Sequence, residues 1–334
     1  MDWRTARDLI EIVGGQSHTL DLEAHSSMFQ DHAPQLSALL ERAGVQAVAR
    51  TYSEFDRDAV EAAARYKIWM CTANLAALIT SCATAAAMSW ALAVNDARWL
   101  QAGLLQNGDM LLGAIASSAA MTGAVSLYVL RHGRLLESWM AKRAAAESHR
   151  TAYFEEVVKR AVAQPAPVAL LALEYFRRYH FDVQKAYFLK RARQHERSGQ
   201  KTVALGAVGA GLAALTSVVG LTSEYAQHVM GALTVNGAAL GAFAIGREQL
   251  TQDHRNSERY IRTYANLVEL SRKLDDVRDA AQEGGAQAVL EFVMAVDEHI
   301  SNEHRQWLEK TEATKAAIAR LEEILGKRAA AGNG

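Results

Sequence analysis

Proline and cysteine are both rare in this sequence of 334 residues, which contains three prolines and two cysteines. A chain with so few prolines has few helix breakers, so long helices are expected. Cys71 and Cys82 stand eleven positions apart in one apolar run. That spacing is roughly 16 Å along a helix, which no disulfide can bridge. Two thiols without partners at ligand spacing also exclude a cysteine-based zinc site, and we expect no metal.

The sequence also lacks the short motifs of nucleotide and hydrolytic chemistry. It contains no Walker loop, no dinucleotide-binding glycine pattern after a strand, no His-Glu-x-x-His and no Gly-x-Ser-x-Gly. Gly206, Gly209 and Gly211 lie inside an apolar run, where close helix packing explains them better than phosphate binding. We therefore expect neither an enzyme nor a cofactor, and no nucleic-acid partner.

Four long segments contain no charged residue and consist mostly of apolar residues. The clearest pair is Thr202–Thr222 and Val229–Gly246, separated by six residues and with Glu224 as the only formal charge. The other pair is Ile68–Asn95 and Met110–Leu130. Uncharged runs of about 18 residues or more are typical of membrane-spanning helices. The pattern predicts an all-α membrane protein with four transmembrane helices, arranged as two hairpins with long cytoplasmic helical extensions.

Basic residues flank the four predicted spans very unevenly. Eighteen lysine and arginine residues lie near the ends that join the long charged segments, whereas the opposite side has Arg98 alone. Since cytoplasmic loops carry the excess of basic residues, both termini and all long helices are predicted to be cytoplasmic. Aromatic residues mark the predicted interfaces: Trp69 and Trp90 lie roughly 31 Å apart along a helix, and Trp99 and Tyr128 stand near other span ends.

The sequence divides into three parts. Residues 1–50 read as short cytoplasmic helices, residues 51–163 as a first two-span unit and residues 168–328 as a second, with Pro165 and Pro167 marking the boundary. Within residues 1–50, a helix is expected over Asp2–Val13 and another beginning near Pro34. His18, His25 and His32 recur every seven residues; a metal site is one reading, and solvated or capping histidines are the other.

The two units show traces of a tandem repeat. Phe55-Asp56 and Phe181-Asp182, which open the helices before the two hairpins, are 126 positions apart, whereas Gly123 and Gly241 in the second spans are 118 apart. The eight-residue difference equals the difference in length between the two outer links, 14 and six residues. This agreement favours a duplicated unit in parallel orientation.

Long charged helices are expected after each hairpin. Arg247–Gln282 contains no glycine or proline, so with the fourth span it predicts one rod of roughly 50 residues. One face of this rod forms an apolar stripe of the kind that packs against another helix, as in a coiled coil. The stripe consists of Tyr260, Tyr264, Leu267, Leu270 and Leu274.

Polar and small residues within the spans are the candidate functional residues. Ser118, Thr122 and Ser126 follow one face of the second span, and Asn236 lies near the middle of the fourth. One interpretation is that they form hydrogen bonds between helices; the other is that they line a hydrated path through the membrane. Such a path would select poorly between ions, since no charged residue lies inside a span. Gly237 and Gly241 form a GxxxG pair, for which we expect helix packing in a homo-oligomer.

Two further stretches carry a family resemblance. The run from Asp182 to Phe188, with Arg191 and His195 after it, and the run from Phe292 to Asp297, followed by Glu303 to Trp307, resemble the SLATT family of two-transmembrane effector domains. Residues 168–310 match best, and the first unit looks like a diverged second copy. The resemblance implies an inner-membrane effector of a bacterial conflict or anti-phage system that forms an oligomeric pore or perturbs the lipid bilayer. It also implies control by a nucleotide-sensing or nucleotide-synthesising partner protein. The alternative is a membrane-anchored helical scaffold or signalling adaptor that conducts no ions.

Overall fold

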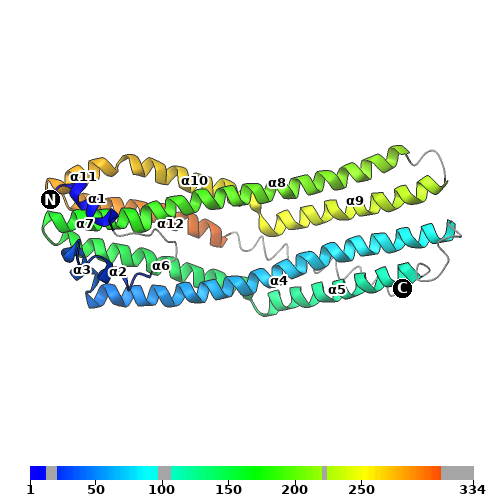
Figure 1. Cartoon of the computed structure of the whole chain (residues 1–334), viewed down its shortest axis with the longest axis horizontal. Coiled ribbons are helices and arrows are strands. Elements are labelled where there is room, and N and C mark those ends of the chain that lie inside the picture. Colours follow the sequence, from blue (N-terminus) through cyan, green and yellow to red (C-terminus); the bar gives the residue numbers. More distant parts are fainter. Residues whose placement is uncertain (13–20, 97–106, 220–223, 310–334) are drawn as a thin grey trace. The chain divides into compact units, whose positions relative to one another are not determined.

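The structure, a computed structural model, describes residues 1–12, 21–96, 107–219 and 224–309 (Figure 1). Nearly all of these residues are helical, and no strand occurs among them. The predicted all-helical class is confirmed. The described residues form two compact units, each assembled from separate parts of the sequence.

The first unit consists of Met1–Ala63, Glu137–Gln194 and Arg255–Glu309. The α-helices that lie wholly or mostly in this unit are, in chain order, α1 (Trp3–Glu11), α2 (His25–Met28), α3 (Pro34–Leu40), α6 (Leu135–Val162), α7 (Ala166–Phe176), α10 (Asp253–Arg272), α11 (Leu274–Gln282) and α12 (Gln287–Glu309). Pro34 begins α3, as the sequence predicts, because its fixed φ suits the first helical turn.

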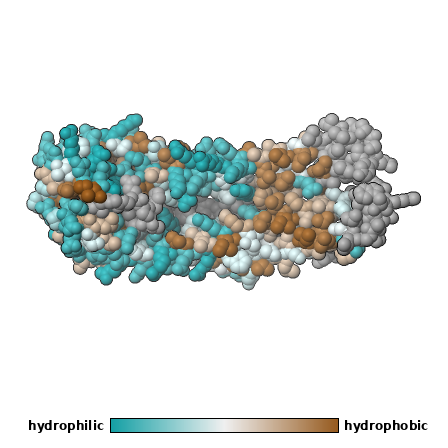
Figure 2. Space-filling model, viewed as in Figure 1, coloured by the Kyte–Doolittle hydropathy of each residue, from teal (hydrophilic) through white to brown (hydrophobic). Residues whose placement is uncertain are grey.

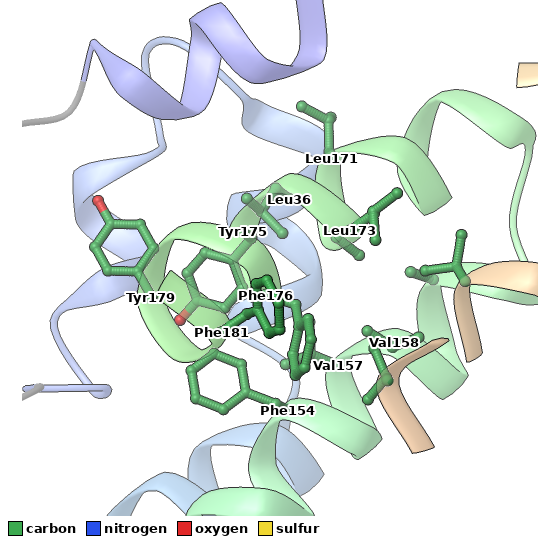
Figure 3. Packing of buried hydrophobic residues seen from close by; sticks show 14 of the residues in the cluster. Leu36, Phe154, Val157, Val158, Leu171, Leu173, Tyr175, Phe176, Tyr179 and Phe181 are labelled. Atoms are coloured by element: carbon green, nitrogen blue, oxygen red, sulfur yellow. The ribbon is translucent and has the colours of Figure 1, made fainter. Parts of the chain in front are cut away.

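Helix α7 is the centre of the first unit. Every residue from Val168 to Phe176 is buried, and α1, α3, α11 and α12 all contact this helix. Figure 3 shows Tyr175 and Phe176 of α7 beside Phe154 of α6. A helix that is buried on all sides is stable only when other helices surround it, so α7 organises the core of the unit.

A short π-helix, η3 (Arg177–Phe181), follows α7 directly and leads into α8 (Asp182–Val219). The backbone N–H of Asp182 donates to the carbonyl of Arg177, the wider i→i+5 bond of a π-turn. All five side chains of η3 are buried. Such turns are rare and often occur at functional sites.

The second unit consists of Ala64–Leu136 and His195–His254 among the described residues. It contains most of α4 (Ala43–Asp96), α5 (Gly108–His132), part of α8, and α9 (Glu224–Thr251). Many large apolar side chains of these helices are exposed, and Figure 2 shows the hydrophobic colour concentrated over them. Examples are Ile68, Met121 and Val203, whose exposed fractions are 64%, 69% and 73%.

Two helices of the described residues are long and apolar enough to cross a membrane: Ala43–Ala91 within α4, and α5. Only 28% of the most apolar stretch of each is buried, whereas α7 is buried from Val168 to Phe176. Helices α8 and α9 do not meet the same test over their described residues. Residues 220–222 of the predicted third span lie outside the described part. Four spans therefore remain a prediction.

The prediction of one rod from the fourth span to Gln282 is wrong. Helix α9 ends at Thr251, Gln252 adopts a positive φ of 48°, and α10 begins at Asp253. A second break at Lys273 separates α10 from α11. The apolar stripe nevertheless packs as expected, since Leu267, Leu270 and Leu274 belong to the buried core and Tyr260 and Tyr264 lie against it.

One of the three histidines of residues 1–50, His25, differs from expectation. His25 is buried, and its Nδ1 lies 2.6 Å from the hydroxyl of Tyr175, so it is neither solvated nor a helix cap. Burial lowers the pKa of His25 to about 4, so the ring is neutral. His32 is exposed, and His18 lies outside the described residues. Position 50, the predicted boundary of the first segment, falls inside α4.

Candidate functional site: the helical hairpins of the second unit

Helices α8 and α9 approach each other most closely at two glycines. A Cβ atom added to Gly209 would lie 2.6 Å from the carbonyl oxygen of Gly237, and one added to Gly237 would lie 2.5 Å from the carbonyl oxygen of Gly209. Both obstacles are backbone atoms, which no side-chain rotation can move. Gly237 is therefore a packing residue, and its neighbour is the other helix of the same hairpin.

Gly241, the second member of the predicted pair, has a different environment. A Cβ atom at Gly241 would meet no described atom within 4 Å. An apolar groove of about 430 Å³ runs along this part of the α8–α9 hairpin. Small residues make up most of its lining: Gly206, Gly209, Ala210, Ala213, Gly237, Ala238, Gly241 and Ala244. Gly241 thus offers an open, small-residue surface.

Two of the hydroxyl groups of α5, those of Thr122 and Ser126, bond to their own helix. Thr122 Oγ1 donates to the carbonyl of Ser118 at 2.9 Å, and Ser126 Oγ donates to the carbonyl of Thr122 at 2.8 Å. Ser118 and Thr122 are exposed, whereas Ser126 is fully buried. A hydroxyl that returns to the i−4 carbonyl is already satisfied without a second helix.

The first hairpin closes through small residues as well. A Cβ atom at Gly123 would lie 3.3 Å from the Cβ of Ala76, and Thr80 Oγ1 lies 3.5 Å from the carbonyl oxygen of Ala116. Ala76, Thr80 and Ala116 are buried. These contacts of small residues join α4 to α5.

The remaining predicted residues occupy varied positions. Asn236 is half-buried in α9, Trp69 and Trp90 are half-buried in α4, and Tyr128 is 59% exposed and stacks on His132. The ring of Trp90 lies against Gly108 at the start of α5. Trp99 is outside the described residues. The grouping of Asn236 with Ser118, Thr122 and Ser126 in one site stays a prediction.

Two unusual backbone positions were not apparent from the sequence. Arg134, between α5 and α6, has a φ of 46°, and Gln252, between α9 and α10, has a φ of 48°. They are the two non-glycine residues with positive φ in the described part, and they stand 118 positions apart. Neither position carries the glycine or asparagine that would signal this conformation.

Side chains stabilise the break at Gln252. The Asp253 carboxylate accepts from Thr251 Oγ1 at 2.9 Å and lies 2.6 Å from His195 Nδ1 on α8. Burial alone would raise the pKa of Asp253, but hydrogen bonds from His195, Ser198 and Thr251 lower it below its usual value. The carboxylate therefore stays ionised where α8 and α9 end their shared packing.

The described residues contain no group of three or more His, Cys, Asp or Glu side chains that could hold a metal ion. The arrangement is that of an all-helical protein with an apolar, largely exposed pair of helices and a buried helical core. Residues 176–307 match the family described as SMODS and SLOG-associating 2TM effector domain 1 (SLATT_1). The match begins next to η3, extends into α12 and confirms the resemblance noted for residues 168–310. Comparisons with curated proteins and with solved structures gave no match.

The SLATT domain is a two-transmembrane effector domain associated with bacterial conflict systems. The matched part of this chain covers most of the second predicted unit, and less than half of the sequence. Helices α4 and α5, which meet the length and apolarity test for spanning, lie outside it.

Proposed function

We propose that the chain is an inner-membrane effector of a bacterial conflict or anti-phage system, with four spans and both termini in the cytoplasm. The observation that carries this proposal is the exposure of large apolar side chains along the second unit, since a water-soluble protein rarely exposes so much contiguous apolar surface. Hydroxyl groups on these helices return to their own backbone, for example in Thr122 and Ser126, which suits a medium without water.

The topology can be tested by cysteine labelling. A cysteine at Asn107, at the start of α5, should react with a membrane-impermeant reagent in intact cells, because this end of the hairpin is predicted to face outward. A cysteine at Gly334 should react only after lysis. Labelling of Gly334 and protection of Asn107 in intact cells would reverse the proposed orientation.

The second hairpin repeats the first in this proposal. Arg134 and Gln252 have the same spacing as Gly123 and Gly241, and each interrupts the chain where an apolar helix gives way to a charged one. This agreement supports a second, diverged SLATT-like copy over residues 51–163. It also supports spans at residues 202–222 and 229–246, in addition to those at residues 68–95 and 110–130.

In its active form, the protein is proposed to assemble into an oligomeric pore or membrane-perturbing complex. Ser118 and Thr122 are exposed residues of α5, and with Ser126 and Asn236 they would keep a narrow path hydrated in an oligomer. Replacing Ser118 and Asn236 together with leucine should abolish ion flux in liposomes while leaving membrane insertion and oligomer size unchanged. Flux equal to that of the unchanged protein would assign these residues to helix packing alone.

Self-association is proposed to use the groove beside Gly241. Gly241→Leu should reduce crosslinked oligomers, because an added Cβ at this position meets no neighbour within 4 Å and a large side chain would occupy the groove that a second copy is proposed to fill. Gly211→Leu is a matched control, since Gly211 also has no described neighbour within 4 Å of an added Cβ but lies outside the groove lining. Unchanged crosslinking of Gly241→Leu would exclude this surface.

The alternative function is a membrane-anchored scaffold or signalling adaptor that conducts no ions. The observation that favours it is that the hydroxyls of Thr122 and Ser126 are already bonded to their own helix. The family's association with SMODS and SLOG proteins supports control by a nucleotide-synthesising or nucleotide-sensing partner under either function. Absence of dye leakage and depolarisation in both the resting and the partner-activated state would favour the scaffold.

A further inference from the structure

A buried polar cluster in the first unit joins three helical segments. It consists of Arg150 on α6, His180 on η3 and Asp297 on α12. Their exposed fractions are 4%, 0% and 4%. Ionisable side chains are seldom buried to this extent unless they are paired, so the charge state of the three groups bears directly on how the segments hold together.

The hydrogen bond between Arg150 and His180 fixes the state of the imidazole. Arg150 Nε donates to His180 Nδ1 at 3.2 Å. Because an arginine always donates, Nδ1 must be unprotonated and the proton of the neutral ring lies on Nε2. Protonation of Nδ1 would place its N–H opposite the N–H of Arg150 Nε, with no acceptor between the two donors. The rings of Phe154 and Phe176 pack beside the imidazole, with centroids 4.6 and 5.2 Å away, and exclude water from it.

Asp297 lies on the other side of His180. Its Oδ1 is 3.3 Å from His180 Nε2, close enough for an ion pair by distance. However, neither carboxylate oxygen of Asp297, nor Nε2 of His180, nor Nη2 of Arg150 has a well-oriented hydrogen bond to any described residue. An ionised carboxylate without hydrogen bonds is strongly disfavoured in a buried place, so the neutral acid is the form that fits this packing.

From this geometry we infer that the Arg150–His180–Asp297 cluster is a proton-sensitive joint, which releases α12 from α6 and η3 when Asp297 loses its proton. The inference does not depend on the proposed membrane function, because all three residues belong to the first unit. It provides a chemical reason for α12 to change its packing within the cytoplasmic pH range.

The other charged groups near the joint set the direction of the effect. Burial and the neighbouring Glu155 raise the pKa of Asp297 to about 8, while Arg150 and Lys159 oppose them. Burial, followed by the charge of Arg150, lowers the pKa of His180 well below 6.5, and Glu147 opposes this. Asp297 is therefore protonated at pH 7 in the joined state, and His180 is neutral.

The two groups act over different pH ranges. The raised pKa of Asp297 favours the joined state fully below pH 3.8, the ordinary value, and this preference is lost as the pH rises through about 8. The lowered pKa of His180 favours the joined state above pH 6.5, and that preference is lost as the pH falls below it. Above pH 6.5 only Asp297 still changes its protonation between the joined and released states, so the joint loosens between pH 6.5 and 8.

Hydrogen exchange of the full chain in lipid nanodiscs tests the joint. The exchange of α12 amides is measured between pH 6.5 and 8 and divided, at each pH, by that of Asp297→Asn, so that the chemical dependence of exchange on pH cancels. The ratio should rise by about tenfold from pH 6.5 to 7.5, because one proton is released on opening. A ratio that stays constant over this range would overturn the inference.

A matched control variant is available on the same helix. Glu298 is the exposed neighbour of Asp297, and Glu298→Gln should keep the full pH dependence of the unchanged protein. Its loss in Glu298→Gln would contradict the assignment to Asp297. If Asp297→Asn does not fold, infrared spectroscopy of the unchanged protein and of Glu298→Gln decides instead. Both should show a protonated-carboxyl band that disappears near pH 8, and absence of such a titration would overturn the inference.

Discussion

The two units bury different kinds of side chain. The core of the first contains many aromatic rings, such as Phe154, Tyr175 and Phe176, and these are fully buried. In the second, α8 meets α9 at Gly209 and Gly237, and α4 meets α5 through residues as small as Ala76. Burying large apolar groups is favourable in water, whereas helices in lipid gain little from it and rely on close backbone approach. This difference is the one expected if, as proposed, the second unit lies in lipid and the first in water.

The largest expected effect comes from the aromatic core. Phe154→Ala should reduce the free energy of unfolding of the first unit by about 3–5 kcal/mol, because it leaves a cavity beside Tyr175 and Phe176. Ile261→Ala, at a 46% exposed position of α10, is the control and should cost far less. Denaturant titration in detergent measures both. Equal costs would mean that the aromatic cluster is not the main source of stability.

A buried ionic network is the second distinctive feature of the first unit. Glu174 is fully buried; its two oxygens accept from Arg177 Nε and Arg278 Nε, both at 2.6 Å. Glu174→Gln should lower stability by about 3 kcal/mol, because Arg177 and Arg278 lose the fully buried carboxylate that they share and keep only less buried partners, such as Asp182 and Asp275. Glu269→Gln removes an exposed pair with Arg272 and should cost at most about 1 kcal/mol. Similar midpoints for the two variants in thermal unfolding would contradict this.

The second unit should respond to added volume rather than lost volume. Gly209→Ala places a methyl group against the backbone of α9 and should destabilise the α8–α9 hairpin by about 1–3 kcal/mol. Gly241→Ala adds the same atom to open space and should have little effect. Protease resistance of the hairpin in nanodiscs distinguishes them. Equal resistance would show that the close approach of the two helices is not required.

Sequence reasoning found the features that depend on local pattern. The helical class, the start of α3 at Pro34 and the family resemblance all rest on residues close together in the chain. The burial of Glu174 could not be inferred, because its partner Arg278 lies 104 positions away. The same holds for His25, whose partner Tyr175 is 150 positions away. The backbone breaks at Arg134 and Gln252 were missed because positive φ at these residue types leaves no compositional trace.

The smallest expected effect on stability concerns a predicted pore residue. Thr122→Val keeps the shape of the side chain and removes a hydroxyl that bonds only to the carbonyl of Ser118 in its own helix. Stability should change by less than about 0.5 kcal/mol, because the helix retains its backbone bonds without that hydroxyl. Thr84→Val is the matched control, since Thr84 is exposed and bonds in the same way to Thr80, yet it is not a predicted lining residue.

Because neither valine variant should disturb folding, a difference between them in ion flux must come from the exposed surface of α5. Under the pore function, Thr122→Val should reduce flux through liposomes, since an apolar lining dewets a narrow path, and Thr84→Val should not. Equal flux in both variants would remove Thr122 from the lining. A large loss of stability in Thr122→Val would show instead that the hydroxyl of Thr122 stabilises the hairpin. The second unit would then depend on individual side chains for its stability, as the first unit does, rather than on close backbone approach alone.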